Sequence, residues 1–177
     1  MNERAATIAT ERFELVPFAP EHLLALLESE EAFAIAFGVQ PAPGLREFFA
    51  SVDVSPAWVE DLRAARHADP FVHGFAIVER GSGLAVGTVG FKGRPDPDGV
   101  VELAYAVVRS LEGRGIATEA ARAATAFALA RADVHRVRAH TLPERGASTR
   151  VLEKCGFAFA GPVDDHHDGP VWRFERE

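Results

Sequence analysis

The sequence contains a single cysteine, Cys155, so no disulfide forms within the chain and a metal site built from cysteine pairs is excluded. It also lacks an apolar run of the ~20 residues that a membrane-spanning helix needs. The opening residues, MNERAATIATERFELV, have no apolar core of the kind found in secretion signals. From these absences we expect a cytoplasmic protein with no membrane association.

Positive charge is scarce, with 19 Lys and Arg against 26 Asp and Glu and a formal net charge of −7. Nucleic-acid-binding domains usually present a basic face, so this composition disfavours that class. The 177 residues, 47% of them hydrophobic, suit one domain with one core. We therefore predict a single domain over residues 1–177.

Strand and helix patterns alternate along the chain. Segments typical of strands are residues 12–18, 71–79, 84–93, 100–108, 134–142, 157–163 and 170–177. Helices are predicted from Pro20, around 31–38, and over 55–70, 116–132 and 144–156, with Ser55 as the cap of the third. The helix between strands 100–108 and 134–142 makes them parallel neighbours, whereas turns join the preceding strands as an antiparallel meander. The pattern predicts an α/β protein with a mixed sheet and helices on both faces.

Two glycines flank Arg114 directly before a strongly helical stretch, in the segment SLEGRGIATEAA from Ser110 to Ala121. The first turn of a helix has unpaired N–H groups and partial positive charge, which favour an anion. Gly113, Gly115 and the N–H groups of residues 114–118 form a candidate phosphate cradle, to which Arg114 adds a charged contact. A strand-to-helix turn without a ligand explains the glycine spacing equally well. The segment lacks the third glycine of the dinucleotide fingerprint and the Gly-Lys-Ser/Thr of a P-loop.

Two segments together resemble a known enzyme family. VVRSLEGRGIATEAARAATAFA is similar to the acyl-CoA-binding motif of the GNAT N-acetyltransferases, and LPERGASTRVLEKCGF is similar to the second motif of that family. The order of elements also matches, so the resemblance covers nearly the whole chain, and it is closest to the branch of ribosomal-protein N-terminal acetyltransferases. It implies a GNAT fold with a mixed, mostly antiparallel sheet of six to seven strands, splayed between the fourth and fifth strands.

The resemblance also implies which residues bind acetyl-CoA. In the family the pantetheine arm pairs with the free edge of the fourth strand, which corresponds here to the backbone of Ala106, Val107 and Val108. The diphosphate would be held by the glycine loop and first helical turn, namely Gly113, Arg114, Gly115, Ile116, Ala117 and Thr118.

Three positions near these motifs need separate predictions. Glu112 stands where the family has Gln or Arg. Arg145 stands where it has Asn, and contacts a phosphate or faces solvent. Ser148 matches the serine of the second motif, and we predict that it contacts or protonates the leaving sulfur; a helix-capping role for its hydroxyl is the alternative.

Acetyl transfer needs a neutral amine, but lysine-like amines (pKa about 10.4) and α-amines (about 7.7–8.0) are mostly protonated at pH 7. A general base therefore helps. Glu102 is the first candidate, because a carboxylate in the middle of an apolar strand is costly without a role and the family often carries a glutamate there. An ion pair with an arginine at the sheet edge is the alternative role for Glu102, and His140 and His73 are the runners-up for the base.

We predict an acetyl-CoA-dependent N-acetyltransferase acting on a primary amine by direct attack; the alternative is a GNAT-fold module that binds an acyl-CoA without catalysis. The acceptor is open: a peptide N-terminus, an aminoglycoside, a polyamine or an amino acid. Its site is expected between residues 31 and 58 and at the turn DDHHDG, where no metal is expected. Aromatic residues of that region, which line the acceptor site or pack in the core, are Phe33, Phe37, Phe48, Phe49 and Trp58. A homodimer through the terminal strand VWRFERE is left open.

Overall fold

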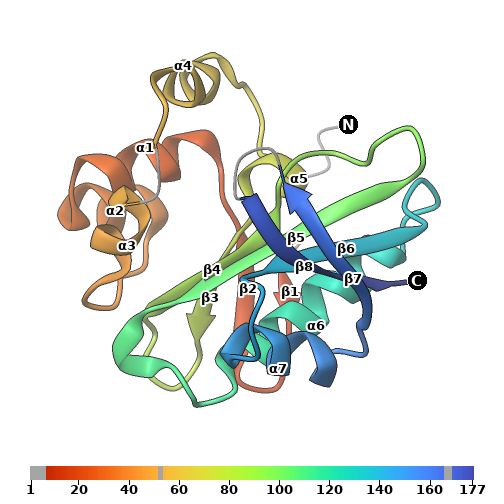
Figure 1. Cartoon of the computed structure of the whole chain (residues 1–177). Helices are drawn as coiled ribbons and strands as arrows, with labels where there is room; N and C mark the ends of the chain where they lie inside the picture. The colour runs from red at the N-terminus through yellow and green to blue at the C-terminus, as the bar shows by residue number, and fades with distance from the viewer. Residues whose placement is uncertain (1–6, 52–53, 166–168) are drawn as a thin grey trace.

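The structure, a computed structural model, describes residues 7–51, 54–165 and 169–177. An eight-stranded sheet forms its centre, with strand order β1-β2-β3-β4-β5-β6-β8-β7 (Figure 1). The strands are β1 (Ile8–Ala9), β2 (Phe13–Pro17), β3 (Phe75–Glu79), β4 (Ala85–Phe91), β5 (Val100–Val107), β6 (Arg136–Thr141), β7 (Ala158–Asp165) and β8 (Gly169–Arg176). The helices are α1 (Pro20–Glu28), α2 (Glu30–Phe37), α3 (Leu45–Ser51), α4 (Pro56–Ala64), α5 (Pro70–His73), the 3-10 turn η1 (Arg109–Leu111), α6 (Ile116–Leu129) and α7 (Ala147–Lys154).

Most predicted elements form where the sequence places them. The side chain of Ser55 accepts a hydrogen bond from the N–H of Trp58, so the predicted cap of α4 is confirmed. The buried face of α6 consists largely of alanine, and these small side chains let the helix pack closely on the sheet. The predicted helix 144–156 appears as α7, with Gly156 at φ +81° just after its end.

The predicted strand 71–79 is wrong at its start. Asp69 caps the short helix α5, because its carboxylate accepts a hydrogen bond from the N–H of Phe71, 3.0 Å away. Pro70 then occupies the first helical position, and the strand β3 begins only after Gly74. The helix predicted over residues 55–70 accordingly ends early, at Ala64. The sequence analysis also missed the helix α3 and the two-residue strand β1. With β1, the sheet has eight strands rather than the predicted six or seven.

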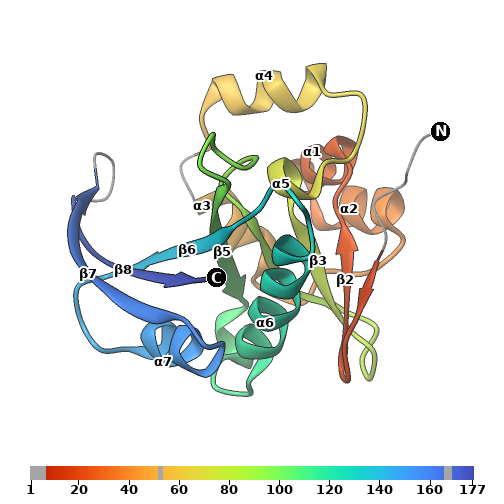
Figure 2. The same ribbon diagram turned by 90° about the vertical axis from the view of Figure 1, so that its right-hand side faces the viewer.

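The sheet divides between β5 and β6. These strands pair in parallel only from Val100–Glu102 to Arg136–Arg138, although β5 continues to Val107 and β6 to Thr141. Beyond Glu102 the two strands separate, and Figure 2 shows β6, β8 and β7 turning away from β5. The predicted mixed, mostly antiparallel sheet with this splay is therefore confirmed.

The terminal strand is not the edge of the sheet. β8 pairs with β6 on one side and with β7 on the other, so VWRFERE has no free edge to pair with a second copy. β7 is the outer strand, and it contains Pro162, which lacks an N–H group for further pairing.

Helices cover the two faces of the sheet unequally. α6 packs against β4, β5 and β6, and α7 against α6 and β6. The helices α1 to α4 lie together as a separate group, at the left and top of Figure 1. Within the described residues, no helix combines the length and apolar character needed to span a bilayer.

Candidate active site

The glycine loop leads from β5 into α6. Gly113 has φ +75° and Gly115 has φ +77°, a left-handed conformation that favours glycine. The stretch 112–115 is exposed, and a Cβ atom at Gly113 would meet nothing within 4 Å. Gly115 caps α6, so the N–H groups of Ile116, Ala117 and Thr118 lie in the first helical turn. This arrangement fits an anion such as a diphosphate.

An ion pair from the start of the chain braces this loop. The guanidinium of Arg12 lies 2.8 Å from Glu119 Oε2 and donates a second hydrogen bond to the carbonyl oxygen of Arg114. The backbone N–H of Arg12 and the hydroxyl of Thr10 both donate to Glu119 Oε1. Burial opposes ionisation of Glu119, but these hydrogen bonds outweigh it and lower its pKa. The turn after β1 therefore holds the start of α6 in place.

The register of β4 and β5 decides which backbone groups of β5 remain open. The N–H of Val108 donates to Val86 and the carbonyl of Glu102 accepts from Lys92. Since backbone groups alternate along a strand, Ala106 also faces β4. Of the three residues predicted to form the free edge, only Val107 directs its N–H and C=O away from β4. Tyr105, which was not among those three, directs its backbone groups the same way. The open edge beside the splay therefore consists of Tyr105 and Val107.

Glu102 lies at the last position where β5 and β6 pair. Its Oε1 is 2.6 Å from Lys92 Nζ and 3.1 Å from His140 Nδ1. Both Oε1 and Nδ1 are buried, yet neither forms a hydrogen bond of normal geometry. Buried polar atoms without hydrogen bonds are uncommon and are enriched at functional sites. Glu102 thus forms the predicted ion pair, but its partner is a lysine rather than an arginine. It also lies beside a histidine.

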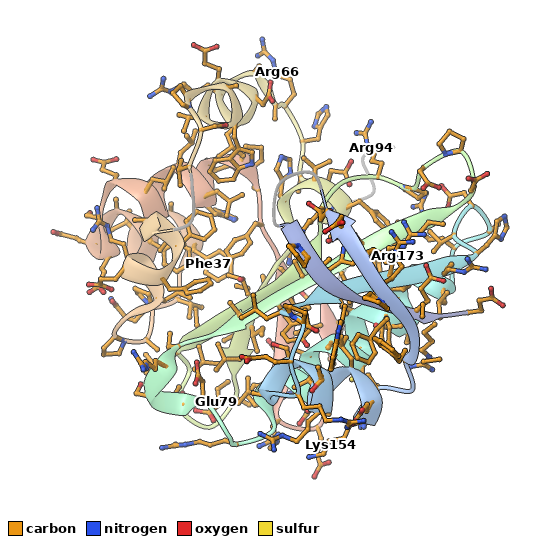
Figure 3. The ribbon with its side chains drawn as sticks, viewed as in Figure 1. Phe37, Arg66, Glu79, Arg94, Lys154 and Arg173 are labelled. Carbon is orange, nitrogen blue, oxygen red and sulfur yellow. The ribbon has the colours of Figure 1, made fainter. Side chains whose placement is uncertain are left out.

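Arg173 contacts the second ring nitrogen of His140. Its Nε donates to His140 Nε2 at 3.3 Å, from the neighbouring strand β8. A neutral imidazole with an acceptor at Nε2 carries its proton on Nδ1, the atom that lies beside Glu102. Arg173 is labelled in Figure 3. Glu102, His140 and Arg173 thus form a continuous polar row across three strands.

The start of α7 carries two further predicted residues. Ser148 is exposed and does not cap the helix, because Thr149 Oγ1 bonds both the N–H and the carbonyl of Gly146. The phenol of Tyr105 donates to the backbone carbonyl of Ser148 at 3.2 Å. Arg145 is exposed and lies 3.4 Å from Glu153 Oε1, so it faces solvent. Burial raises the pKa of Tyr105, so this phenol keeps its proton at neutral pH.

A cavity of about 490 Å³ opens on the face of the sheet that carries Glu102. Three of the predicted aromatic residues line it, namely Phe48, Phe49 and Trp58. Phe33 and Phe37 instead stack on each other, with ring centroids 4.9 Å apart, and belong to the packing around Phe18; Phe37 is labelled in Figure 3.

His73 also lines this cavity, although the sequence placed it in a strand. Its Nδ1 accepts a hydrogen bond from the N–H of Asp69, and burial lowers its pKa. The described residues contain no group of three metal-ligating side chains, and His166, His167 and Asp168 of the turn DDHHDG lie outside them.

The sequence profile of the acetyltransferase (GNAT) domain matches residues 12–158. The chain belongs to the GNAT acetyltransferase family. This confirms the family predicted from the two motifs, and membership implies acetyl transfer from acetyl-CoA. The residues that would bind the coenzyme fit it, since an exposed glycine loop at a helix start adjoins an open strand edge.

Three similar proteins illustrate the likeness. The uncharacterised N-acetyltransferase YjdG of Bacillus subtilis (strain 168) is 36% identical over 81 residues, which is 46% of this chain and 48% of that protein. The match thus spans about half the length of that relative.

Two solved structures share the GNAT fold. The ribosomal-protein-S5-alanine acetyltransferase of Vibrio fischeri has a TM-score of 0.66 and 15% identity, over 97% of this chain and 96% of that chain. Mycobacterium smegmatis RimJ in complex with a CoA-disulfide has a TM-score of 0.63 and 22% identity, over 97% and 87%.

The sequence analysis missed several site residues. Lys92 contacts Glu102 from the loop just after β4, Arg173 contacts His140 from β8, and Arg12 reaches the glycine loop from more than 100 positions away. No local pattern marks such partners. Tyr105 is the sole tyrosine of the sequence, and the alternation of side chains along β5 indicates that its ring lies on the face opposite Glu102.

Proposed function

We propose that this protein transfers an acetyl group from acetyl-CoA to a primary amine by direct attack, with Glu102 as the general base. The observation that carries the proposal is the buried Oε1 of Glu102, which lacks a hydrogen bond of normal geometry at the point where β5 and β6 separate. A carboxylate held there is poised to accept a proton from an incoming ammonium group.

The binding part of the proposal rests on backbone groups. Gly113, Gly115 and the N–H groups of residues 114–118 would hold the diphosphate, with Arg114 at the exposed surface as an additional cation. Ala106 and Val107 end β5 and Val108 follows it; of these, Val107, together with Tyr105, would pair with the pantetheine arm. Arg145 would reach a phosphate only after leaving Glu153.

The chemical part assigns the protons. Glu102 takes one proton from the ammonium, and Lys92 and His140 hold the carboxylate beside the splay. The neutral amine then forms the new N–C bond as the C–S bond breaks. The leaving thiolate takes a proton from a hydroxyl at the start of α7, and the second proton that the nitrogen loses as it becomes a neutral amide restores that hydroxyl. Ser148 is the predicted donor, and the phenol of Tyr105 reaches the same point.

The test compares Glu102→Gln with Glu175→Gln. Glu175 lies on the same face of the sheet, where it pairs with Arg138. We expect Glu102→Gln to lower kcat by roughly 10²–10⁴-fold, the usual contribution of a general base. Coenzyme A affinity by calorimetry should change less than about twofold, and Glu175→Gln should leave kcat nearly unchanged.

Two outcomes would contradict the proposal. Equal activity of Glu102→Gln and the unmodified protein would remove Glu102 from the mechanism. Coenzyme A binding without acetylation of any amine would instead support the alternative, a module that binds the coenzyme without catalysis. The solvent-facing position of Arg145 agrees with that alternative.

A further inference from the structure

The cavity beside the splay has a floor of small residues. Thr88, Gly90, Ala104 and Ala106 share one face of β4 and β5, the face that also carries Glu102. The absence of large side chains there leaves an open space in front of the strands. Gly90 cannot be larger, because a Cβ atom at this position would lie 2.6 Å from the Cα of Gly74.

Helices supply the walls, and these are apolar and aromatic. Phe48, Phe49 and Trp58 line the cavity from α3 and α4, and the rings of Phe49 and Trp58 are in contact, with centroids 5.9 Å apart. Phe75 and Phe91 border the cavity too, but Phe75 contacts Phe127 of α6 and Phe91 stacks on Phe71. A volume of about 490 Å³ lies within the range of pockets that hold small molecules.

No Asp, Glu, Lys or Arg is among the described residues that line the cavity. A second ammonium group of a polyamine or aminoglycoside would therefore enter the cavity without a carboxylate to pair with it. Burying an unpaired charge is strongly unfavourable. The lining favours an acceptor that carries one amine and is otherwise uncharged.

His73 adds one specific polar contact. The side chain is 9% exposed, and Nδ1 is occupied by the N–H of Asp69. A neutral imidazole with an acceptor at Nδ1 carries its proton on Nε2. Nε2 has no hydrogen bond to a described residue, so it can donate one to a ligand in the cavity that His73 lines. Ser55, by contrast, already accepts from Trp58.

We propose that the acceptor is an α-amino amide with a large apolar side chain, either as a free amide or as the first residue of a peptide. Its side chain occupies the cavity, against Phe49 and Trp58, and its carbonyl oxygen accepts a hydrogen bond from His73 Nε2. Its amine then lies toward Glu102, on the same face of the sheet. This inference rests on the proposed function, since it names the substrate class of that site.

The primary test measures kcat/KM of the unmodified protein for matched amines. Phenylalaninamide should exceed alaninamide by roughly 10- to 100-fold, because the cavity buries the ring. Lysinamide, spermidine and free phenylalanine, which bring an additional charge, should be poor acceptors. Comparing kcat/KM for a peptide that begins with Phe and for phenylalaninamide distinguishes a peptide acceptor from a free amide.

Two variants locate the contacts. His73→Asn retains an acceptor for the N–H of Asp69 but loses the Nε2 donor. It should reduce kcat/KM for phenylalaninamide by roughly 3- to 10-fold and leave phenethylamine, which has no carbonyl, unchanged. Trp58→Ala should reduce the preference for phenylalaninamide over alaninamide, whereas Glu60→Ala, on the exposed side of α4, should not.

The outcomes separate this inference from the proposed function. Acetylation of lysinamide or spermidine at rates equal to phenylalaninamide would overturn the inference and leave the acetyltransferase intact. A loss of phenethylamine activity equal to that of phenylalaninamide in His73→Asn would remove the carbonyl contact. No acetylation of any amine, with coenzyme A still bound in calorimetry, would overturn the proposed function itself.

Discussion

The two halves of the sheet differ in how their faces are covered. Nearly every residue of β3 and β4 is buried, because helices pack on both of their faces. On β6 buried residues alternate with partly exposed ones, and the partly exposed face carries Arg136, Arg138 and His140. One half is therefore an apolar core, and the other presents charged side chains. The candidate site lies at the splay between them, where Glu102 of β5 meets His140 of β6.

The largest expected effect tests the apolar half. Phe75 is fully buried and its ring meets Phe127 edge to face. Phe75→Ala should lower the free energy of unfolding by about 3–5 kcal/mol, measured by urea denaturation. Arg138→Ala, in the charged half, should cost less than about 1 kcal/mol, because its partner Glu175 is partly solvated. Similar losses of unfolding free energy in Phe75→Ala and Arg138→Ala would mean that the two halves of the sheet do not differ as described.

The second prediction concerns the ion pair that joins the turn between β1 and β2 to the glycine loop. Glu119→Gln should lower the free energy of unfolding by about 1–2 kcal/mol at pH 7, since charged hydrogen bonds are lost at a partly exposed site. The pKa of Glu119 is lower in the folded chain than the unfolded value of about 4.3. Its contribution is therefore present above that value and is lost as the pH falls through the folded pKa. Denaturation of both proteins from pH 7 to pH 3 should show the two stabilities converging; a constant difference would contradict this.

The smallest expected effect tests the link between the halves. The phenol of Tyr105 reaches from β5 to the carbonyl of Ser148 on α7, and Tyr105→Phe should cost about 1 kcal/mol. Burial raises the pKa of Tyr105 above the unfolded value of about 10. Its contribution is therefore complete below pH ~10 and declines at higher pH, where the unfolded chain releases the proton. Urea denaturation at pH 8 and above pH 10 checks this, and a stability gap that widens with pH would be the contrary result.

Local patterns predicted much of the fold and the loop part of the site. The cap at Ser55, the helix after Gly115 and the parallel pairing of β5 with β6 depend on neighbouring residues or on short connections. The error at Phe71 arose because aromatic and β-branched residues resemble a strand, whereas Asp69 and Pro70 start a helix.

The catalytic surroundings were harder to predict, because they combine distant segments. Glu102 and His140 were identified one at a time, but their proximity follows from strand register rather than from spacing in the sequence. Lys92, just after β4, and Arg173 of β8 complete the row. The edge of β5 shows the same limit, since the sequence does not reveal which of Ala106 and Val107 bonds to β4.

The contact of Arg12 with Arg114 and Glu119 has a consequence for how the protein responds to its coenzyme. Anything that immobilises the loop at Gly113 and Gly115 also restrains the backbone that carries Arg12. Amide hydrogens of β1 and β2 should then exchange with deuterium more slowly when coenzyme A is present, although these strands lie far from the glycine loop in the sequence. The first strands of the chain would thus report coenzyme occupancy at a distance.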